Sequence, residues 1–281
     1  MSATGIAIRG LSKLFSTRDG EVRALENINL DIAPGSFVCL AGPTGCGKTT
    51  LLRIIAGLES PTAGGVTIGN RPVDGPRPDA GMVFQQYALF PWRNVLDNVA
   101  FGLEMRGVPR QERRERAREL IELVGLTRFA HSRTWELSGG MQQRVAIARS
   151  LATDPALLLM DEPFGALDER TRHRLQDELL AVWRRTGTTV VFVTHNIDEA
   201  VYLGERVLVL ADRPSRIAGD FRVDLPHSRD RIAPGYVRVL LDIRAVLEEI
   251  TRPGETEESA NQEGDRDEEK PASPGSACCV R

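Results

Sequence analysis

The stretch Phe37-Val38-Cys39-Leu40-Ala41-Gly42-Pro43-Thr44-Gly45-Cys46-Gly47-Lys48-Thr49 decides the fold class of this 281-residue chain. It opens on an apolar run, and the part from Gly42 onward matches the phosphate-binding pattern G-x-x-x-x-G-K-[ST] without exception. Glycines let backbone N–H groups turn onto phosphate oxygens, and the N-terminus of a following helix adds its positive end. We therefore predict a strand, a phosphate loop (Gly42–Thr49) and a helix. Lys48 would reach the β and γ phosphates, and Thr49 would offer its hydroxyl to Mg²⁺.

Apolar runs of strand length recur along the chain, with helical patterns between several of them. The runs alternate little, as in strands buried on both faces; they are Phe37–Ala41, Gly81–Phe84, Leu157–Met160, Val190–Val193 and Arg206–Leu210. The helical patterns are Lys48–Ala56, Glu169–Arg185 and Asn196–Leu203. This order predicts an α/β fold with a mostly parallel sheet.

Two earlier parts of the chain depart from that pattern. Ile6–Ile8 and Ile28–Ile32 alternate better, which suggests antiparallel strands at the N-terminal edge. Residues 95–149 lack convincing strands and contain a charged helical pattern at Arg110–Leu123. We therefore expect a helical insertion into an α/β core.

The C-terminal part changes character twice. After Leu210 we expect two short strands and a last amphipathic helix at Pro234–Ile250. From Thr251 onward large apolar residues nearly vanish, and Pro, Gly, Ser, Glu and Asp dominate. We therefore predict one domain over residues 1–251 and an acidic, disordered tail over residues 252–281.

The charges are balanced outside the tail. Of 36 basic and 39 acidic residues, four and eight lie after Thr251, which leaves 32 and 31 in residues 1–251. This balance gives no reason to expect nucleic acid as a partner. The run Arg110–Arg116 mixes both signs and holds Glu112 and Arg116 as an (i, i+4) pair, which is typical of a solvated helix face.

Cysteine and hydropathy patterns bear on the compartment. The four cysteines show no zinc-site spacing and no disulfide framework, which indicates ordinary thiols in a reducing compartment. We see no secretory signal at the N-terminus and no apolar stretch approaching the ~18 residues that a membrane span needs. We expect a soluble chain whose membrane role, if any, comes through a partner.

A second motif is the strand Leu157-Leu158-Leu159-Met160, which ends in Asp161-Glu162. In phosphate-loop NTPases an aspartate at this position holds Mg²⁺. Glu162, one residue further, would polarise the attacking water as general base.

The third motif, Leu137-Ser138-Gly139-Gly140-Met141-Gln142-Gln143-Arg144, distinguishes between NTPase families. Its glycines would open a helix whose N-terminal amides can contact a second phosphate. In this order the motifs closely resemble those of ABC ATPases, over residues 6–250. The resemblance implies a phosphate-loop NTPase core with an antiparallel β subdomain and an inserted α-helical subdomain.

The resemblance also assigns individual residues. Phe15 takes the place of the aromatic that stacks on adenine, and Gln85 that of the glutamine that contacts Mg²⁺ or the water. His195 matches the switch histidine, and Asp168 ends the segment that crosses the dimer interface. The implied catalytic residues are thus Glu162, His195 and Gln85, and the implied Mg²⁺ ligands are Thr49, Gln85 and Asp161. The implied ATP-binding residues are Phe15, Gly42, Pro43, Thr44, Gly45, Cys46, Gly47, Lys48, Thr49, Thr50, Ser138, Gly139, Gly140 and Asp168.

The resemblance further implies that no single chain makes a whole site. Two copies, or a copy and a close paralogue, would face head to tail with each ATP between Lys48 of one and Ser138–Gly140 of the other. Tyr87, Phe90 and Trp92 would help form a groove for a short helix of a membrane subunit.

Three kinds of ABC protein remain open at this point: an importer subunit, an exporter subunit and a non-transport ATPase. Segments such as Phe90-Pro91-Trp92 and Arg213-Pro214-Ser215-Arg216-Ile217 resemble the nitrate/sulfonate/taurine importer subgroup. The implied partners are two permease subunits and a periplasmic or lipid-anchored substrate-binding protein, at the cytoplasmic face of the cell membrane. The implied cargo is an aliphatic sulfonate first, with taurine or nitrate as alternatives.

Overall fold

The computed structural model describes residues 4–18 and 20–251. Its centre is a six-stranded sheet with the order β10-β9-β3-β8-β7-β6. The strands are β3 (Phe37–Ala41), β6 (Ala80–Val83), β7 (Leu157–Asp161), β8 (Thr189–Val193), β9 (Arg206–Leu210) and β10 (Ile217–Arg222). Neighbouring strands are parallel except for the antiparallel pair β9 and β10.

Both faces of this sheet are covered, which explains the unbroken apolar runs. In β7, Leu157 and Leu159 face one hydrophobic cluster, whereas Leu158 and Met160 face the other. Each of these side chains is at most 2% exposed. Burial of one such side chain stabilises the fold by about 1.5–3 kcal/mol.

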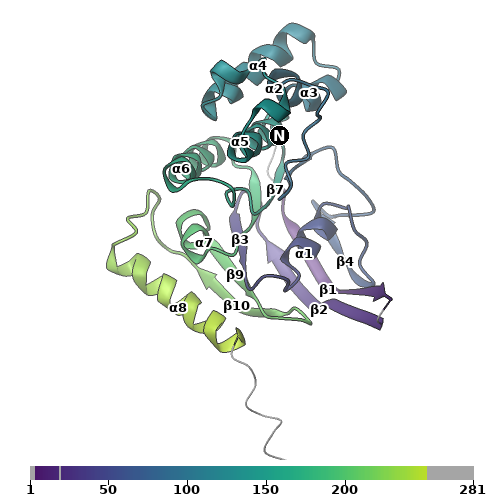
Figure 1. Ribbon diagram of the computed structural model, residues 1–281. Coiled ribbons are helices and arrows are strands. Elements are labelled where there is room, and N and C mark those ends of the chain that lie inside the picture. The colour runs from purple at the N-terminus through teal and green to yellow at the C-terminus, as the bar shows by residue number, and fades with distance from the viewer. Residues whose placement is uncertain (1–3, 19, 252–281) are drawn as a thin grey trace, which may run out of the picture. The chain divides into compact units, whose positions relative to one another are not determined.

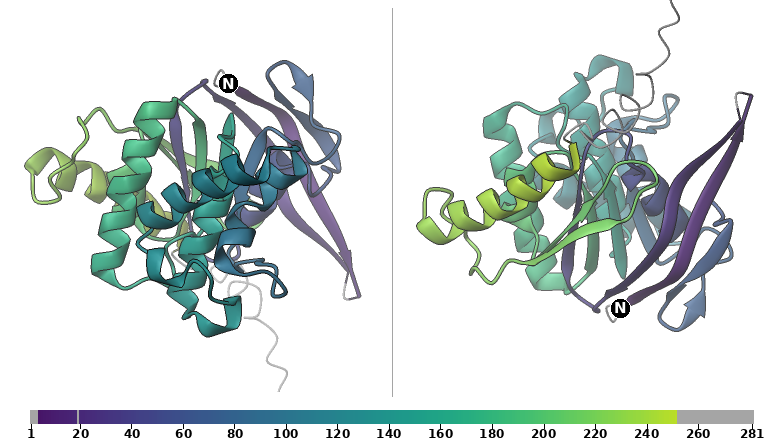
Figure 2. Two further views of the ribbon diagram at one scale, coloured as in Figure 1. Left: turned by 90° about the horizontal axis from the view of Figure 1, so that it is seen from above. Right: turned by 90° about the horizontal axis from the view of Figure 1, so that it is seen from below.

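One cluster lies beneath a four-stranded antiparallel sheet and helix α1 (Lys48–Ile55). This sheet has the order β2-β1-β4-β5, from β1 (Ile6–Thr17), β2 (Gly20–Ile32), β4 (Ala63–Ile68) and β5 (Arg71–Pro72). In Figure 2 the long purple strands β1 and β2 lie on the opposite side of the molecule from α6 and α8. The predicted antiparallel strands are therefore present, but they form a separate sheet and not an edge of the main one.

The other cluster is covered by helices. They are α2 (Val95–Val99), α3 (Phe101–Met105), α4 (Arg110–Leu123), α5 (Gly139–Leu151), α6 (Glu169–Thr186), α7 (Ile197–Leu203) and α8 (Pro234–Thr251). Single-turn helices Thr127–Phe129 and Thr134–Glu136 lead from α4 to α5. Figure 1 shows α2, α3 and α4 together at the top of the view, beside α5. The predicted fold class, with its helical insertion, is confirmed.

Three details of the prediction were wrong or incomplete. One strand, β10, and not two, lies between Leu210 and Pro234 in the described chain. Arg116 pairs with Glu119 at 3.0 Å and with Asp154 at 2.7 Å, not with Glu112, because α4 packs beside the loop that follows α5. Strands β4 and β5 were not predicted. The tail predicted for residues 252–281 lies outside the described residues.

Candidate nucleotide site

The phosphate loop connects β3 to α1 and needs glycine where the chain passes close to its neighbours. Gly42 has φ 153° and Gly47 has φ 108°, in the region that favours glycine. A Cβ atom on Gly42 would lie 2.7 Å from the carbonyl oxygen of Leu210, and one on Gly47 would lie 3.0 Å from that of Ala24. The loop is thus enclosed by β9 and β2 and its path is fixed.

Lys48 extends along the inside of this loop. It is 5% exposed, and its Nζ donates to the carbonyl oxygens of Gly42 at 2.9 Å and Pro43 at 2.7 Å. Cys46 lies behind it with Sγ 3.8 Å from the ammonium. Burial raises the pKa of the Cys46 thiol, more than the nearby lysine lowers it, so the side chain is a neutral thiol at pH 7.

Asp161 and Thr49 meet at the start of α1. The Thr49 hydroxyl donates to Asp161 Oδ1 at 3.0 Å, and Asp161 is 3% exposed. Burial raises the pKa of Asp161, the Thr49 hydrogen bond lowers it, and the adjacent Glu162 raises it. The result is a desolvated carboxylate at the end of the phosphate loop.

Three polar side chains converge at the carboxyl ends of β6, β7 and β8. Glu162 has φ 46°, uncommon for a non-glycine residue, and its backbone N–H donates to Val193 at 3.0 Å. Gln85 Nε2 lies 3.4 Å from Glu162 Oε2, and His195 Nδ1 lies 3.2 Å from the same oxygen. Ligands of open α/β sheets bind at this edge.

A cavity of about 610 Å³, here called the site cavity, opens beside these groups. Its lining includes nine of the predicted site residues: Phe15, Thr44, Gly45, Gly47, Lys48, Thr49, Thr50, Gln85 and Glu162. The ammonium of Lys13 lies 4.7 Å from the centre of the Phe15 ring. The structure therefore brings an aromatic ring of β1, the phosphate loop and an acidic strand end to one cavity.

Ser138, Gly139, Gly140 and Asp168 do not line the site cavity. Ser138 caps α5 by accepting from the Met141 N–H at 3.4 Å, and Asp168 caps α6 by accepting from Thr171 at 3.0 Å. A Cβ atom on Gly140 would lie 3.3 Å from the carbonyl oxygen of Ala166, so the two segments are packed together. Within one chain the predicted second half of the site is thus assembled away from the first half.

Two sets of contacts near the site were not predicted. Arg172 donates to the Leu167 carbonyl oxygen at 3.0 Å and lies 3.5 Å from Glu199, which accepts from Thr194 at 2.7 Å. This chain of contacts joins the segment before Asp168 to the residue before His195. Arg213 donates from Nε to the Gly45 carbonyl oxygen at 2.7 Å and lines the site cavity. Neither set has a local sequence signal, since the contacts of Arg172 with Glu199 and of Arg213 with Gly45 join segments that are distant in sequence.

The exposed aromatic region lies between β6 and α2. Trp92 is 69% exposed, and Phe90 packs between Trp92 and Phe101 with ring centres 5.5 and 4.4 Å apart. Arg133 donates to the Trp92 carbonyl oxygen at 2.6 Å, and an antiparallel bridge joins Arg133 to Asn94. The loop that carries Trp92 is thus attached to the segment that leads into Ser138.

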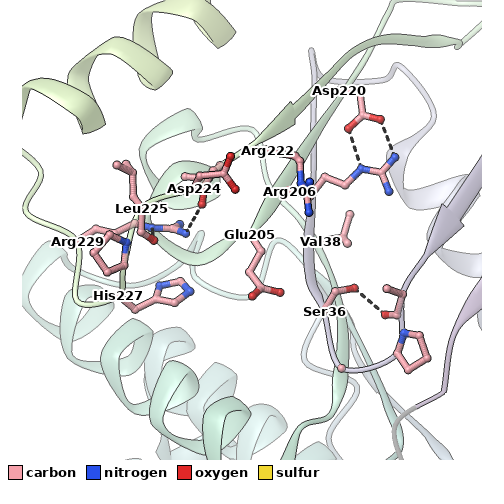
Figure 3. Close-up of a pocket in the computed structure, with 15 residues that line it drawn as sticks. Ser36, Val38, Glu205, Arg206, Asp220, Arg222, Asp224, Leu225, His227 and Arg229 are labelled. Carbon is pink, nitrogen blue, oxygen red and sulfur yellow. Dashed lines mark hydrogen bonds and ion pairs between the residues drawn. The ribbon is translucent and has the colours of Figure 1, made fainter.

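A larger cavity, of about 1050 Å³, lies at the opposite ends of β3 and β9 and is called the second cavity. Figure 3 shows its charged lining, with Arg206 paired to Asp220, Glu205 near the middle of the view and His227 to the left of Glu205. None of the predicted site residues lines it. We assign the chemistry to the site cavity, because the phosphate loop and the acidic strand end meet there.

Comparison with known proteins agrees with this geometry. A family profile described as "ABC transporter" matches residues 25–165. An uncharacterized ABC transporter ATP-binding protein of Methanocaldococcus jannaschii is 51% identical over 244 residues, which are 87% of this chain and 91% of that protein. The nitrate import ATP-binding protein NrtD of Synechocystis is 48% identical, covering 79% of this chain and 83% of that protein. The taurine import ATP-binding protein TauB of Burkholderia pseudomallei is 45% identical, covering 88% and 96%.

Solved structures give the same result. A dimeric post-hydrolysis state of the ATP-binding cassette MJ0796, bound to ADP and Pi, aligns with a TM-score of 0.72 and 36% identity. A second dimeric structure of MJ0796, a bacterial ABC transporter cassette, aligns with a TM-score of 0.74 and 37% identity. Each alignment covers 79% of this chain and 100% of the cassette. The chain therefore belongs to the ABC transporter family, as an ATP-binding subunit that hydrolyses ATP.

Proposed function

We propose that this chain is the ATP-hydrolysing subunit of an importer for a small organic or inorganic anion. An aliphatic sulfonate is the first choice of cargo, and taurine or nitrate are the alternatives. The observation that carries the ATPase part is the convergence of Gln85, Glu162 and His195 beside the phosphate loop. Similarity to nitrate and taurine import proteins supports the importer part.

In this proposal the loop amides and Lys48 bind the phosphates of ATP, and Phe15 stacks on adenine. Glu162 accepts a proton from the attacking water, which Gln85 and His195 help to position. Both side chains lie within 3.4 Å of the Glu162 carboxylate, so the three can act on one water.

Thr49, Asp161 and Gln85 would hold Mg²⁺. The donors fit this ion, since Mg²⁺ prefers oxygen and is commonly bound by one or two carboxylates together with substrate phosphates. When bound, the ion neutralises charge on the β and γ phosphates.

The second half of the site comes from the partner subunit in this proposal. Ser138–Gly140 lie outside the site cavity of their own chain, and both MJ0796 structures are dimers. ATP bound from both sides holds the two subunits together, and hydrolysis releases them.

Two permease subunits receive the motion through the groove beside Tyr87, Phe90 and Trp92, and a substrate-binding protein delivers the cargo. No helix in the described ranges is long and apolar enough to cross a membrane; we place the subunit at the cytoplasmic face of the cell membrane, bound to the permeases.

Light scattering during size-exclusion chromatography tests the dimer. We expect Glu162→Gln to elute as a dimer with saturating Mg-ATP and as a monomer without nucleotide. Lys48→Ala in the same background should remain monomeric, because it lacks the phosphate-binding cation. A Glu162→Gln protein that stays monomeric with bound ATP would refute the shared site.

Reconstitution with the permeases and the binding protein tests the cargo. ATPase activity should rise when the binding protein is loaded with an aliphatic sulfonate, and less with taurine or nitrate. Equal stimulation by nitrate alone would instead assign a nitrate importer. Failure to co-purify with any permease would favour a non-transport role.

A further inference from the structure

The loop after β9 reaches back over the phosphate loop and is fixed there. Its residue Ser215 is fully buried, and its backbone N–H donates to Ala24 of β2 at 3.2 Å. The carbonyl oxygen of Ser215 accepts from Glu26 at 3.0 Å, and the Ala211 N–H donates to Arg216 at 2.9 Å. These bonds close residues 211–216 into a short loop attached to β2. The residue at its tip, Arg213, is therefore held beside the phosphate loop.

Arg213 uses only part of its hydrogen-bonding capacity. Its Nε donates to the Gly45 carbonyl oxygen at 2.7 Å, and its backbone N–H donates to Asp212 at 2.8 Å. Nη2 lies 3.7 Å from the position that a Cβ atom on Gly45 would take. Within the described part of the chain neither Nη atom has a hydrogen-bond or ion-pair partner. Because Arg213 also lines the site cavity, its free Nη donors lie beside the space that the phosphates of ATP would occupy in the proposed function.

This placement has two physical effects on a phosphate ligand. The Gly45 carbonyl oxygen carries a partial negative charge that repels a bound anion. The hydrogen bond from Arg213 Nε offsets this charge. It also fixes the peptide between Gly45 and Cys46, so the loop keeps one conformation. The free Nη donors match phosphate oxygens in charge and in fork geometry.

We infer that Arg213 is a nucleotide-binding residue that contacts the phosphate chain of ATP from outside the phosphate loop. The inference rests on the proposed ATP hydrolysis at this site. It assigns a direct part in binding to Arg213 alone among residues 211–216, since Arg213 is the residue of this loop that lines the site cavity.

The test compares Arg213→Ala with Arg216→Ala, both in the Glu162→Gln background so that ATP is not consumed. Arg216 is a matched control: it belongs to the same loop and is exposed, but it pairs with Glu26 and lies outside the site cavity. Calorimetric titration with Mg-ATP should give a Kd raised about tenfold for Arg213→Ala, the loss expected for one charge-assisted contact. Arg216→Ala should change the Kd less than about twofold. The difference should shrink at 0.5 M KCl, because exposed charges are screened.

Equal Kd values for the two variants would overturn the inference. A weakening that does not respond to salt and accompanies a lower melting temperature of the nucleotide-free protein would overturn it too, because it indicates a structural role. If the parent Glu162→Gln protein binds no Mg-ATP, the proposed ATPase function fails instead. The two failures are thus distinguishable.

Discussion

Replacing Arg229 by methionine should destabilise the fold strongly. Arg229 is 6% exposed, and its guanidinium donates to five backbone carbonyl oxygens at the end of α7 and in the segment after β10: Val201, Tyr202, Gly204, Val223 and Leu225. Methionine fills much of the space but leaves these acceptors without donors.

The size of the loss follows from burial and geometry. Burial lowers the pKa of Arg229, so part of the favourable hydrogen bonding is offset by desolvation of the charge. Three of the five bonds are long, at 3.2 Å, and two of the acceptor residues, Val223 and Leu225, line the second cavity. Leaving a buried acceptor without its donor costs about 1–3 kcal/mol, and because these offsets reduce the sum over five acceptors we expect a total loss of about 3 kcal/mol. For a domain of this size that lowers Tm by roughly 6–12 °C.

Urea unfolding and calorimetry measure this loss, with Arg222→Met as control. Arg222 lines the same cavity and is exposed, so its replacement should change stability by less than about 0.5 kcal/mol. If Arg229→Met lost less than about 1 kcal/mol relative to the control, then Arg229 would not be what satisfies the end of α7.

Three further predictions concern pH, metal and the half-site. Burial lowers the pKa of His227 from 6.5 to about 4, and the nearby Arg229 and Arg184 add to this shift. The contribution of His227 to stability is therefore complete above pH 6.5 and is lost as the pH falls toward 4. We expect the Tm of His227→Asn to depend less on pH in that window than the Tm of the native protein. Burial raises the pKa of Asp161 because it removes water from the carboxylate, and this desolvation costs stability in the folded protein. Asp161→Asn should therefore melt above the native protein without Mg²⁺ and below it with Mg-ATP, as measured by scanning fluorimetry. A Cβ atom at position 140 would lie 3.3 Å from the Ala166 carbonyl oxygen. We expect Gly140→Ala to leave the Kd for ATP within about twofold and to abolish ATP-driven dimerisation, as measured by light scattering.

Much of the first half of the candidate site could be predicted from the sequence, because its main motifs are short continuous stretches. The phosphate loop and the pair Asp161-Glu162 each follow an apolar strand, and the strand order then brings them together. The contacts of Arg213 and Arg172 could not be read in the same way. Each arginine joins segments that are distant in sequence, and a single arginine carries no local pattern.

Two errors of the prediction, one in a strand and one in an ion pair, have simple causes. Strand β4 begins with Ala63-Gly64-Gly65, which hides the alternation that only Val66 and Ile68 display. The expected ion pair of Glu112 and Arg116 satisfied helical spacing, but Asp154 offers Arg116 a partner from outside the helix. Spacing within one helix does not reveal such a competitor.

The attachment between the Trp92 loop and residues 130–133 has a mechanical consequence. Val95 donates to Ser132 at 3.0 Å and Leu96 to Ala130 at 2.8 Å, in addition to the Arg133 bond. Five residues beyond Arg133 the chain reaches Ser138, with a single helical turn between them. A displacement of Trp92 should therefore be transmitted to Ser138, because the connection between them is short and held by hydrogen bonds. In the proposed dimer, the position of a permease helix that contacts Trp92 would in this way affect the nucleotide bound by the other subunit.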